Sequence, residues 1–288
     1  MSAPTVRRRR LGAELRRLRE AAGLKMGDVT ERTGIPASKV SRIESAQVNV
    51  KAADLSTLLD CYGVDGASDA GKREALHALA KQGGRRGWWQ PYRDIISTDY
   101  ADLISLEAEA KSMRSFETLL IPGLLQTAAY ARATIAAINM TDPPERVNAL
   151  AEVRVARQSV LTTREDPLEF WAIIHESALR SGIGSSPQVM RDQLQRLLDL
   201  QELPNVSIQA LAWDTAPHPG MAGPFAVLSF PESADLDVVL VENLTSALYV
   251  EDAAEVSRYG SAFERLRAAA LPFDKTADLI AQLKDSTT

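Results

Sequence analysis

The chain has 288 residues, of which 45% are hydrophobic, and a formal net charge of −5 at pH 7. This length is sufficient for two domains with separate cores. A membrane span is excluded because no run of about 18 apolar residues occurs. A secretory signal peptide is excluded because no apolar segment follows the basic residues 7–10. We therefore expect a cytoplasmic protein.

The charge is distributed unevenly along the chain. Residues 1–90 contain 17 Lys/Arg and 10 Asp/Glu, a net charge of +7, whereas residues 91–288 contain 16 and 28, a net charge of −12. A basic N-terminal part ahead of an acidic remainder is typical of a protein whose N-terminal part binds nucleic acid. The run Arg7–Arg10 is either a solubilising tail or an arm that follows DNA phosphates, and its composition favours neither.

Five helices are expected in residues 1–82. The first and the fourth are amphipathic, because their apolar residues recur at steps of three and four. These residues are Leu11, Leu15, Leu18 and Ala22 in the first helix and Leu55, Leu58, Leu59 and Tyr62 in the fourth. Gly23 and Gly63 follow these two helices, as glycine commonly does at helix C-termini. A fifth helix over residues 68–82 completes an all-α domain.

Residues 24–44 are predicted to form a helix-turn-helix, two short helices joined by a turn at Gly34. In this motif the second helix enters the major groove of DNA while the first crosses the backbone. Val40 and Ile43 lie three residues apart and face inward. The outer face then carries small, hydrogen-bonding and cationic side chains, which suit base edges and phosphates. These candidate DNA-binding residues are Ala37, Ser38, Lys39, Ser41 and Arg42.

The pattern resembles the xenobiotic-response-element (Xre) family of phage-repressor-like helix-turn-helix domains over about residues 8–64. The segment Ser41-Arg42-Ile43-Glu44 matches the end of that family's recognition helix. The resemblance implies that Ala37, Ser38 and Arg42 occupy base-reading positions and that Lys39 occupies a neighbouring one.

The chain departs from the family pattern at the starts of both helices of the motif. Lys25 and Met26 stand where the family often has a Ser or Thr cap and a Gln. A missing cap oxygen costs about 1 kcal/mol. Pro36 opens the second helix where Ser is common, and proline is tolerated there although it donates no N–H.

Residues 83–98 are predicted to link two domains. The segment GGRRGWWQPY (83–92) contains three glycines and one proline, which interrupt the helical pattern. Trp88 and Trp89 are expected to dock onto one of the domains, because large aromatic surfaces are costly to leave exposed.

Residues 99–288 are predicted to form a mixed α/β domain, so the chain is α+β overall. Helices are expected over residues 99–110, 124–138, 144–162, 187–203, 253–271 and 274–284. An extended segment is expected over residues 112–122 and a strongly apolar strand over residues 168–176. Strands rich in Val, Ile and Tyr are expected over residues 205–211, 225–230, 237–243 and 246–252. The Gly/Pro-rich loop over residues 212–225 either lines a pocket or partner surface or is a rigid turn between two strands.

The residue pattern of this second domain does not predict an enzyme. His175-Glu176 begins like a zinc-protease motif, but no second histidine follows at the required spacing. Cys61 and the three histidines, at positions 77, 175 and 218, lack metal-ligand spacing. A nucleophile paired with a base is also missing. We therefore expect no catalytic residues, no metal and no cofactor.

Several blocks of the second domain carry another family resemblance. The blocks are LIPGLLQTAAYAR (120–132) with Arg154, Arg157 and Gln158, then IIHESALR (173–180), HPGMAGPFAVLSFP (218–231) and VVLVENLTSALYVED (238–252). Over about residues 90–285 they resemble the C-terminal domain of WhiJ-like actinobacterial regulators, which are antitoxin-like Xre proteins. Family members are commonly paired with a very small BldB-like protein and have no established catalytic activity.

These observations lead to one main hypothesis and two alternatives. The main hypothesis is a DNA-binding transcriptional regulator whose C-terminal domain binds a small BldB-like protein. We expect a homodimer, because one such N-terminal domain reads only a half-site of duplex DNA. The first alternative is a one-component transcription factor whose C-terminal domain senses a small molecule. The second is an enzyme with a DNA-targeting domain, which the lack of a paired nucleophile and base disfavours.

Overall fold

The structure is a computed structural model that describes residues 5–65, 69–82, 88–184, 186–230 and 236–287. It divides the chain into two compact units with the boundary between Trp88 and Trp89. We describe each unit by itself. Residues 83–87 of the predicted linker lie outside the described residues.

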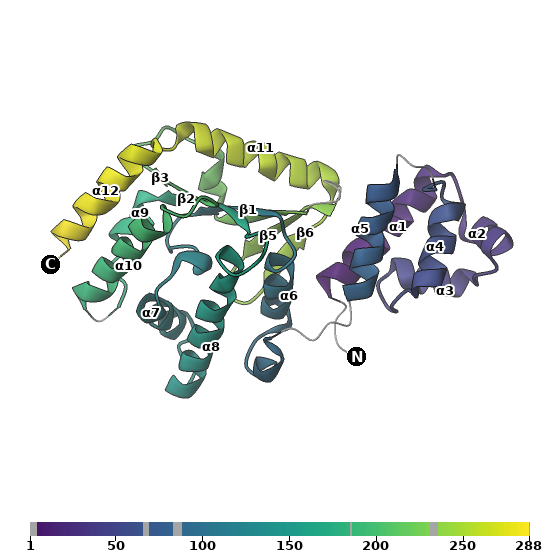
Figure 1. Cartoon of the computed structure of the whole chain (residues 1–288), viewed down its shortest axis with the longest axis horizontal. Helices are drawn as coiled ribbons and strands as arrows, with labels where there is room; N and C mark the ends of the chain where they lie inside the picture. The colour runs from purple at the N-terminus through teal and green to yellow at the C-terminus, as the bar shows by residue number, and fades with distance from the viewer. Residues whose placement is uncertain (1–4, 66–68, 83–87, 185, 231–235, 288) are drawn as a thin grey trace. The chain divides into compact units, whose positions relative to one another are not determined.

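The first unit is all helical, as predicted. Its helices are α1 (Val6–Ala21), α2 (Met26–Thr33), α3 (Ala37–Glu44), α4 (Ala52–Cys61) and α5 (Ala70–Gln82) (Figure 1). Apart from Ala22, which is exposed, the apolar residues expected to face inward form one core cluster, in which Leu15, Val29 and Leu55 are fully buried. Gly23, Gly34 and Gly63 have φ of +70°, +72° and +79°, so each ends its helix in the left-handed conformation that glycine adopts most readily.

The second unit is built on one mixed sheet of six strands in the order β3-β2-β1-β4-β5-β6. The strands are β1 (Ser112–Glu117), β2 (Glu169–His175), β3 (Val206–Leu211), β4 (Phe225–Ser229), β5 (Val238–Glu242) and β6 (Ala247–Val250). Strands β1, β2 and β3 pair in parallel, whereas β1–β4, β4–β5 and β5–β6 pair antiparallel. All six strands therefore coincide with segments predicted from the sequence.

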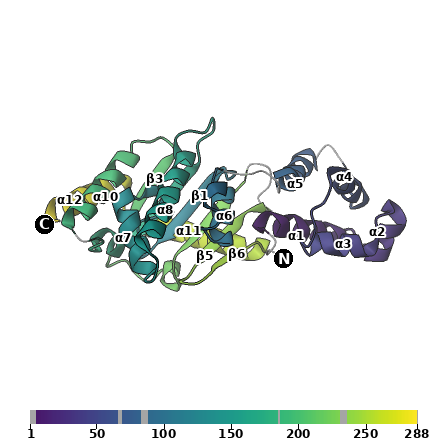
Figure 2. The same ribbon diagram turned by 90° about the horizontal axis from the view of Figure 1, so that it is seen from below.

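Helices cover both faces of this sheet (Figures 1 and 2). Helix α11 (Ala253–Ala269) crosses one face, where Phe263 and Leu266 pack against Phe116 of β1 and Ile173 of β2. The other face carries α6 (Thr98–Glu107), α7 (Ala128–Ile138) and α8 (Pro144–Ala156). Helices α9 (Glu176–Arg180), α10 (Pro187–Leu200) and α12 (Phe273–Ser286) complete the unit.

Two helices differ from their predicted bounds. The helix predicted over residues 124–138 begins only at Ala128, because the Thr127 hydroxyl accepts a hydrogen bond from Tyr130 N at 3.2 Å and so caps the helix there. The helix predicted over residues 144–162 ends at Ala156 and continues as a 3₁₀ turn, Arg157–Leu161. The short helix α9 was not predicted, since five residues show too little periodicity.

The start of the second unit lies within the predicted linker. Gln90–Tyr92 forms a 3₁₀ turn, and Trp89 packs against Ile96, Ile104 and Val153. Docking of Trp89 onto a domain is therefore confirmed, whereas Trp88 remains 41% exposed. Over the ranges that the structure describes, no helix is long and apolar enough to cross a membrane.

Candidate nucleic-acid interface

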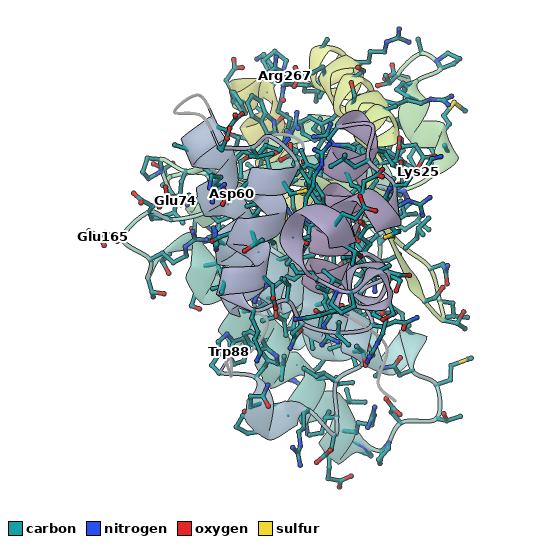
Figure 3. The ribbon with its side chains drawn as sticks, turned by 90° about the vertical axis from the view of Figure 1, so that its right-hand side faces the viewer. Lys25, Asp60, Glu74, Trp88, Glu165 and Arg267 are labelled. Carbon is teal, nitrogen blue, oxygen red and sulfur yellow. The ribbon has the colours of Figure 1, made fainter. Side chains whose placement is uncertain are left out.

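Helix α2 is capped by a residue inside the helix rather than by the one before it. Lys25, labelled in Figure 3, precedes α2 and has no side-chain oxygen to offer. The Asp28 carboxylate instead accepts a hydrogen bond from the Lys25 backbone N–H at 2.7 Å. Asp28 also lies in the first turn, where a negative charge is favourable. The cost expected from the missing cap is therefore partly offset.

The turn between α2 and α3 is held by short-range hydrogen bonds. Gly34 N–H donates to Thr30 O at 2.9 Å, and Ile35 N–H donates to the Thr33 hydroxyl at 3.1 Å. Val29 and Ile35 are buried on either side of the turn. This arrangement sets the direction in which α3 leaves the turn.

Helix α3 presents a buried inner face and a solvent-facing outer face. Pro36 precedes the helix, and its carbonyl accepts hydrogen bonds from Lys39 N at 2.8 Å and Val40 N at 3.1 Å. Val40 and Ile43 are buried in the core of the unit. Among the predicted DNA-binding residues, Ser38, Ser41 and Arg42 are exposed, and Ala37 and Lys39 are half-buried. All five lie in this one helix.

Lys39 forms an ion pair with a residue of the neighbouring helix α4. Its ammonium lies 2.7 Å from the Asp54 carboxylate of α4, and the two side chains are 42% and 21% exposed. An ion pair of this exposure contributes about 0–1 kcal/mol, but it orients the Lys39 side chain toward α4. The sequence analysis did not anticipate this pair, because the two residues are 15 positions apart in different helices.

Hydrogen bonds between Arg19 and Glu44 hold the C-terminal end of α3 against α1. The Arg19 guanidinium donates to both carboxylate oxygens of Glu44, at 2.8 and 3.0 Å, and to Leu24 O at 2.9 Å. The hydrogen bond that Arg19 donates to the Glu44 carboxylate raises the pKa of Arg19. Glu44, the last residue of the Xre-like motif, is therefore a structural residue and is not available to DNA.

A glycine allows this close approach of α1 and α3. A Cβ atom at Gly12 would lie 2.6 Å from Glu44 O and 2.8 Å from Ile43 O. Backbone atoms cannot move away as the end of a flexible side chain can, so only glycine fits without a shift of one helix. Ala46, two residues beyond α3, has φ of +60°, which is unusual for a residue with a side chain.

Exposed cations lie on α2 and α3 and on the residues just before α2 and α4. Lys25 and Arg32 lie at the two ends of α2, Arg42 lies on α3, and Lys51 precedes α4. All four are exposed. Positive charges placed around a helix that enters the major groove can neutralise phosphates on both sides of that groove.

Helix α3 is short, has a solvent-facing polar side and an inner apolar face, and is joined by a glycine turn to α2. These features define a helix-turn-helix DNA-binding domain. Its attachment to a separate α+β domain is the architecture of a transcriptional regulator.

Comparison with known families agrees with this assignment. Residues 10–70 match a family model described as a helix-turn-helix domain. Residues 100–282 match the family described as "Domain of unknown function (DUF5753)". This second match covers more than half of the chain, and the chain belongs to that family. Neither description names an enzyme. No curated protein and no solved structure matches the chain.

Proposed function

We propose that the protein is a sequence-specific transcriptional regulator in which residues 1–82 bind DNA, residues 83–98 link the domains and residues 99–288 form a regulatory domain. The observation that carries the DNA-binding part is the outer face of α3, where Arg42 is exposed on the side opposite the buried Val40 and Ile43. Such a face combines a cation with small hydrogen-bonding residues, as base readout requires.

Within this proposal the five residues of α3 have different tasks. Ser38, Ser41 and Arg42 contact base edges, and Ala37 permits close approach of the helix to the groove. Lys39 contacts a phosphate beside the groove, because its pairing with Asp54 directs it away from the exposed helix face. The protein binds DNA as a homodimer, since two such domains double the contacts that one half-site offers.

Arg42→Ala tests the DNA-binding assignment. We expect it to lower the affinity for the specific operator by about 1–3 kcal/mol, the usual value of a good base contact, while non-specific binding falls less. Footprinting at matched salt concentration measures the change. Arg16→Ala is the control, because Arg16 is an exposed arginine on α1, paired with Glu20. Equal footprints for the two variants would remove Arg42 from the interface.

The regulatory domain is proposed to bind a small protein partner, of the BldB-like kind that accompanies WhiJ-like, antitoxin-like regulators. The loop between β3 and β4 supports this part. Trp213 and Met221 in that loop are 67% and 74% exposed. Exposed tryptophan is the side chain most often found at the energetic centre of a protein interface.

Trp213→Ala tests the partner proposal. We expect the variant to weaken the complex with the product of an adjacent BldB-like gene by about 2 kcal/mol or more, as for an interface hot spot. Calorimetry with the full chain measures the affinity. Leu119→Ala is the control, because Leu119 is equally exposed, at 67%, outside this loop. If Trp213→Ala binds the partner as tightly as Leu119→Ala does, the loop is not the docking surface.

A second candidate function is a one-component regulator whose C-terminal domain senses a small molecule. The observation that favours it is a pocket of about 600 Å³ in the second unit. Small-molecule sites typically enclose roughly 300–1,000 Å³.

A further inference from the structure

The pocket lies entirely within the second unit, among α6, α7, α8 and the turn that joins β5 to β6. Three kinds of surface line it: a wall of carboxylates, a wall of guanidinium groups and an apolar wall. Together these three surfaces restrict the chemistry of a ligand.

The acidic wall is formed by Glu242 of β5 and Asp99 of α6, which both line the pocket. A third carboxyl group belongs to the same corner. Because β1 and β5 both run antiparallel to β4, Glu117 and Glu242 end their strands at the same edge of the sheet. Phe116 and Val241 pack on the α11 side, so Glu117 and Glu242 point to the opposite face.

In this corner of the sheet, burial and the charge of Glu242 outweigh the opposing effects of Arg157 and Arg154 on the pKa of Glu117. Burial, followed by repulsion from Glu242, raises the pKa of Glu117 from 4.5 to about 8. A positive group that entered the corner would stabilise the ionised form of Glu117. Among the described residues, the Glu242 side chain has no ion pair of its own.

The basic wall is formed by Arg154 of α8, with Arg157 one turn further along the chain behind it. Arg154 lines the pocket and donates one hydrogen bond, to Gln126 Oε1 at 3.2 Å. The Arg157 guanidinium stacks on the ring of Tyr100 at 5.1 Å. It lies 3.5 Å from Glu107 Oε1, which is longer than a charge-assisted hydrogen bond.

Several donors at the floor of the pocket are unsatisfied. Arg154 Nε, Arg157 Nε and the Tyr100 hydroxyl are buried, and each lacks a hydrogen-bond partner within the described part of the chain. A buried donor without an acceptor costs about 1–3 kcal/mol, so such groups are normally satisfied by water or by a ligand. Arg154 and Tyr100 both line the pocket, so two of these three side chains with unsatisfied donors border the space that a ligand would occupy.

The apolar wall is formed by Ile135 and Ile138 of α7 with Leu150 of α8. At the rim, Met140 and Leu244 are 82% and 73% exposed. Large apolar side chains left this exposed at the mouth of a pocket are typical of a surface that a ligand covers.

We propose that this pocket binds a small zwitterion with an apolar body, of the amino-acid or short-peptide class. Its ammonium group lies against Glu242 and Asp99, its carboxylate accepts hydrogen bonds from Arg154, and its side chains contact Ile135 and Leu150. A purely anionic ligand would be repelled by the acidic wall. A purely cationic ligand would leave the donors of the basic wall unsatisfied. This inference rests on the second candidate function, a regulator that senses a small molecule, and names the class of that molecule. It does not depend on the residues proposed to bind DNA.

Three related probes separate the two charges. Leucyl-leucine carries both, N-acetyl-leucyl-leucine lacks the ammonium group, and leucyl-leucinamide lacks the carboxylate. We expect calorimetry with the full chain to detect leucyl-leucine at a Kd below about 1 mM. Each neutralised probe should bind about 10-fold or more weakly, because hydrogen bonds to charged groups are the strong ones. If no probe binds, or if all three bind equally, the proposal is overturned.

Two variants assign the ammonium subsite. Glu242→Gln changes an exposed side chain, so the fold is retained. It should reduce the preference for leucyl-leucine over the N-acetyl probe by about 3-fold or more, and Asp99 accounts for the preference that remains. Glu165→Gln is the control, because Glu165, labelled in Figure 3, is exposed and does not line the pocket. If both variants keep the wild-type preference for the zwitterion, Glu242 does not hold an ammonium group. Footprinting of the same preparations tests DNA binding separately.

Discussion

The contact between α1 and α3 at Gly12 offers the most direct test of how the recognition helix is held. In Gly12→Ala, the new methyl group would lie 2.6 Å from Glu44 O and 3.0 Å from Glu44 C. Overpacking of this kind typically costs about 1–3 kcal/mol. Alanine in place of glycine within a helix returns roughly 0.5–1 kcal/mol. We therefore expect a net loss of about 1–2 kcal/mol in the free energy of unfolding of the first unit.

Gly27→Ala is the matched control for this experiment. Gly27 also lies in a helix of the first unit, but no atom lies within 4 Å of a Cβ placed there. We expect this variant to be neutral or more stable by up to about 1 kcal/mol.

Hydrogen exchange of peptides from α1 and α3, followed by mass spectrometry, measures the local opening free energy in the full chain. Gly12→Ala should also weaken operator binding, because α3 must shift away from α1. Equal exchange rates for the two variants would refute the close contact between the helices.

Three further predictions concern α3, the DNA interface and the core of the second unit. Ala46→Gly should be close to neutral by thermal unfolding, since relief of the left-handed backbone, roughly 1–2 kcal/mol, offsets the loss of a buried methyl group, about 0.8 kcal/mol. Ala46→Val should instead lower the midpoint temperature of unfolding. Equal midpoints for the two variants would contradict the φ of +60° at Ala46. Operator affinity should fall steeply with salt, by about 10³–10⁵ between roughly 50 and 200 mM if the dimer makes about 6–10 phosphate contacts, and a flat titration would argue against a DNA-binding domain. Because the pKa of Glu117 is raised to about 8, the folded unit binds this proton more tightly than the unfolded chain does, and the stability of the unit should fall as pH rises from about 5 to 8. Glu117→Gln should weaken this pH dependence, as measured by thermal unfolding at several pH values. An unchanged pH profile would exclude Glu117 as its source.

The elements that were predicted correctly are those with strong local signals. The helices of the first unit follow from apolar residues at steps of three and four, and their ends follow from glycines such as Gly23 and Gly34 that adopt positive φ. Strands β3 to β6 follow from short runs rich in Val, Ile and Tyr, and β2 follows from its apolar run, whereas β1 (SMRSFE) contains no β-branched residue. The outer face of α3 follows as soon as Val40 and Ile43 are assigned to the core, because the helix leaves no other side for the remaining residues.

The sequence by itself therefore determined most of the secondary structure, the helix-turn-helix and the set of α3 residues proposed to contact DNA, since all of these depend on neighbours within one or two turns. Only the tertiary structure decided which residues hold α3 in place: Arg19 reaches Glu44 across 25 positions, and Lys39 is drawn to Asp54. It also decided the pocket of the second unit, whose walls combine Asp99, Arg154 and Glu242. Such groupings depend on how distant elements pack, and the periodicity of each element carries no information about its partners.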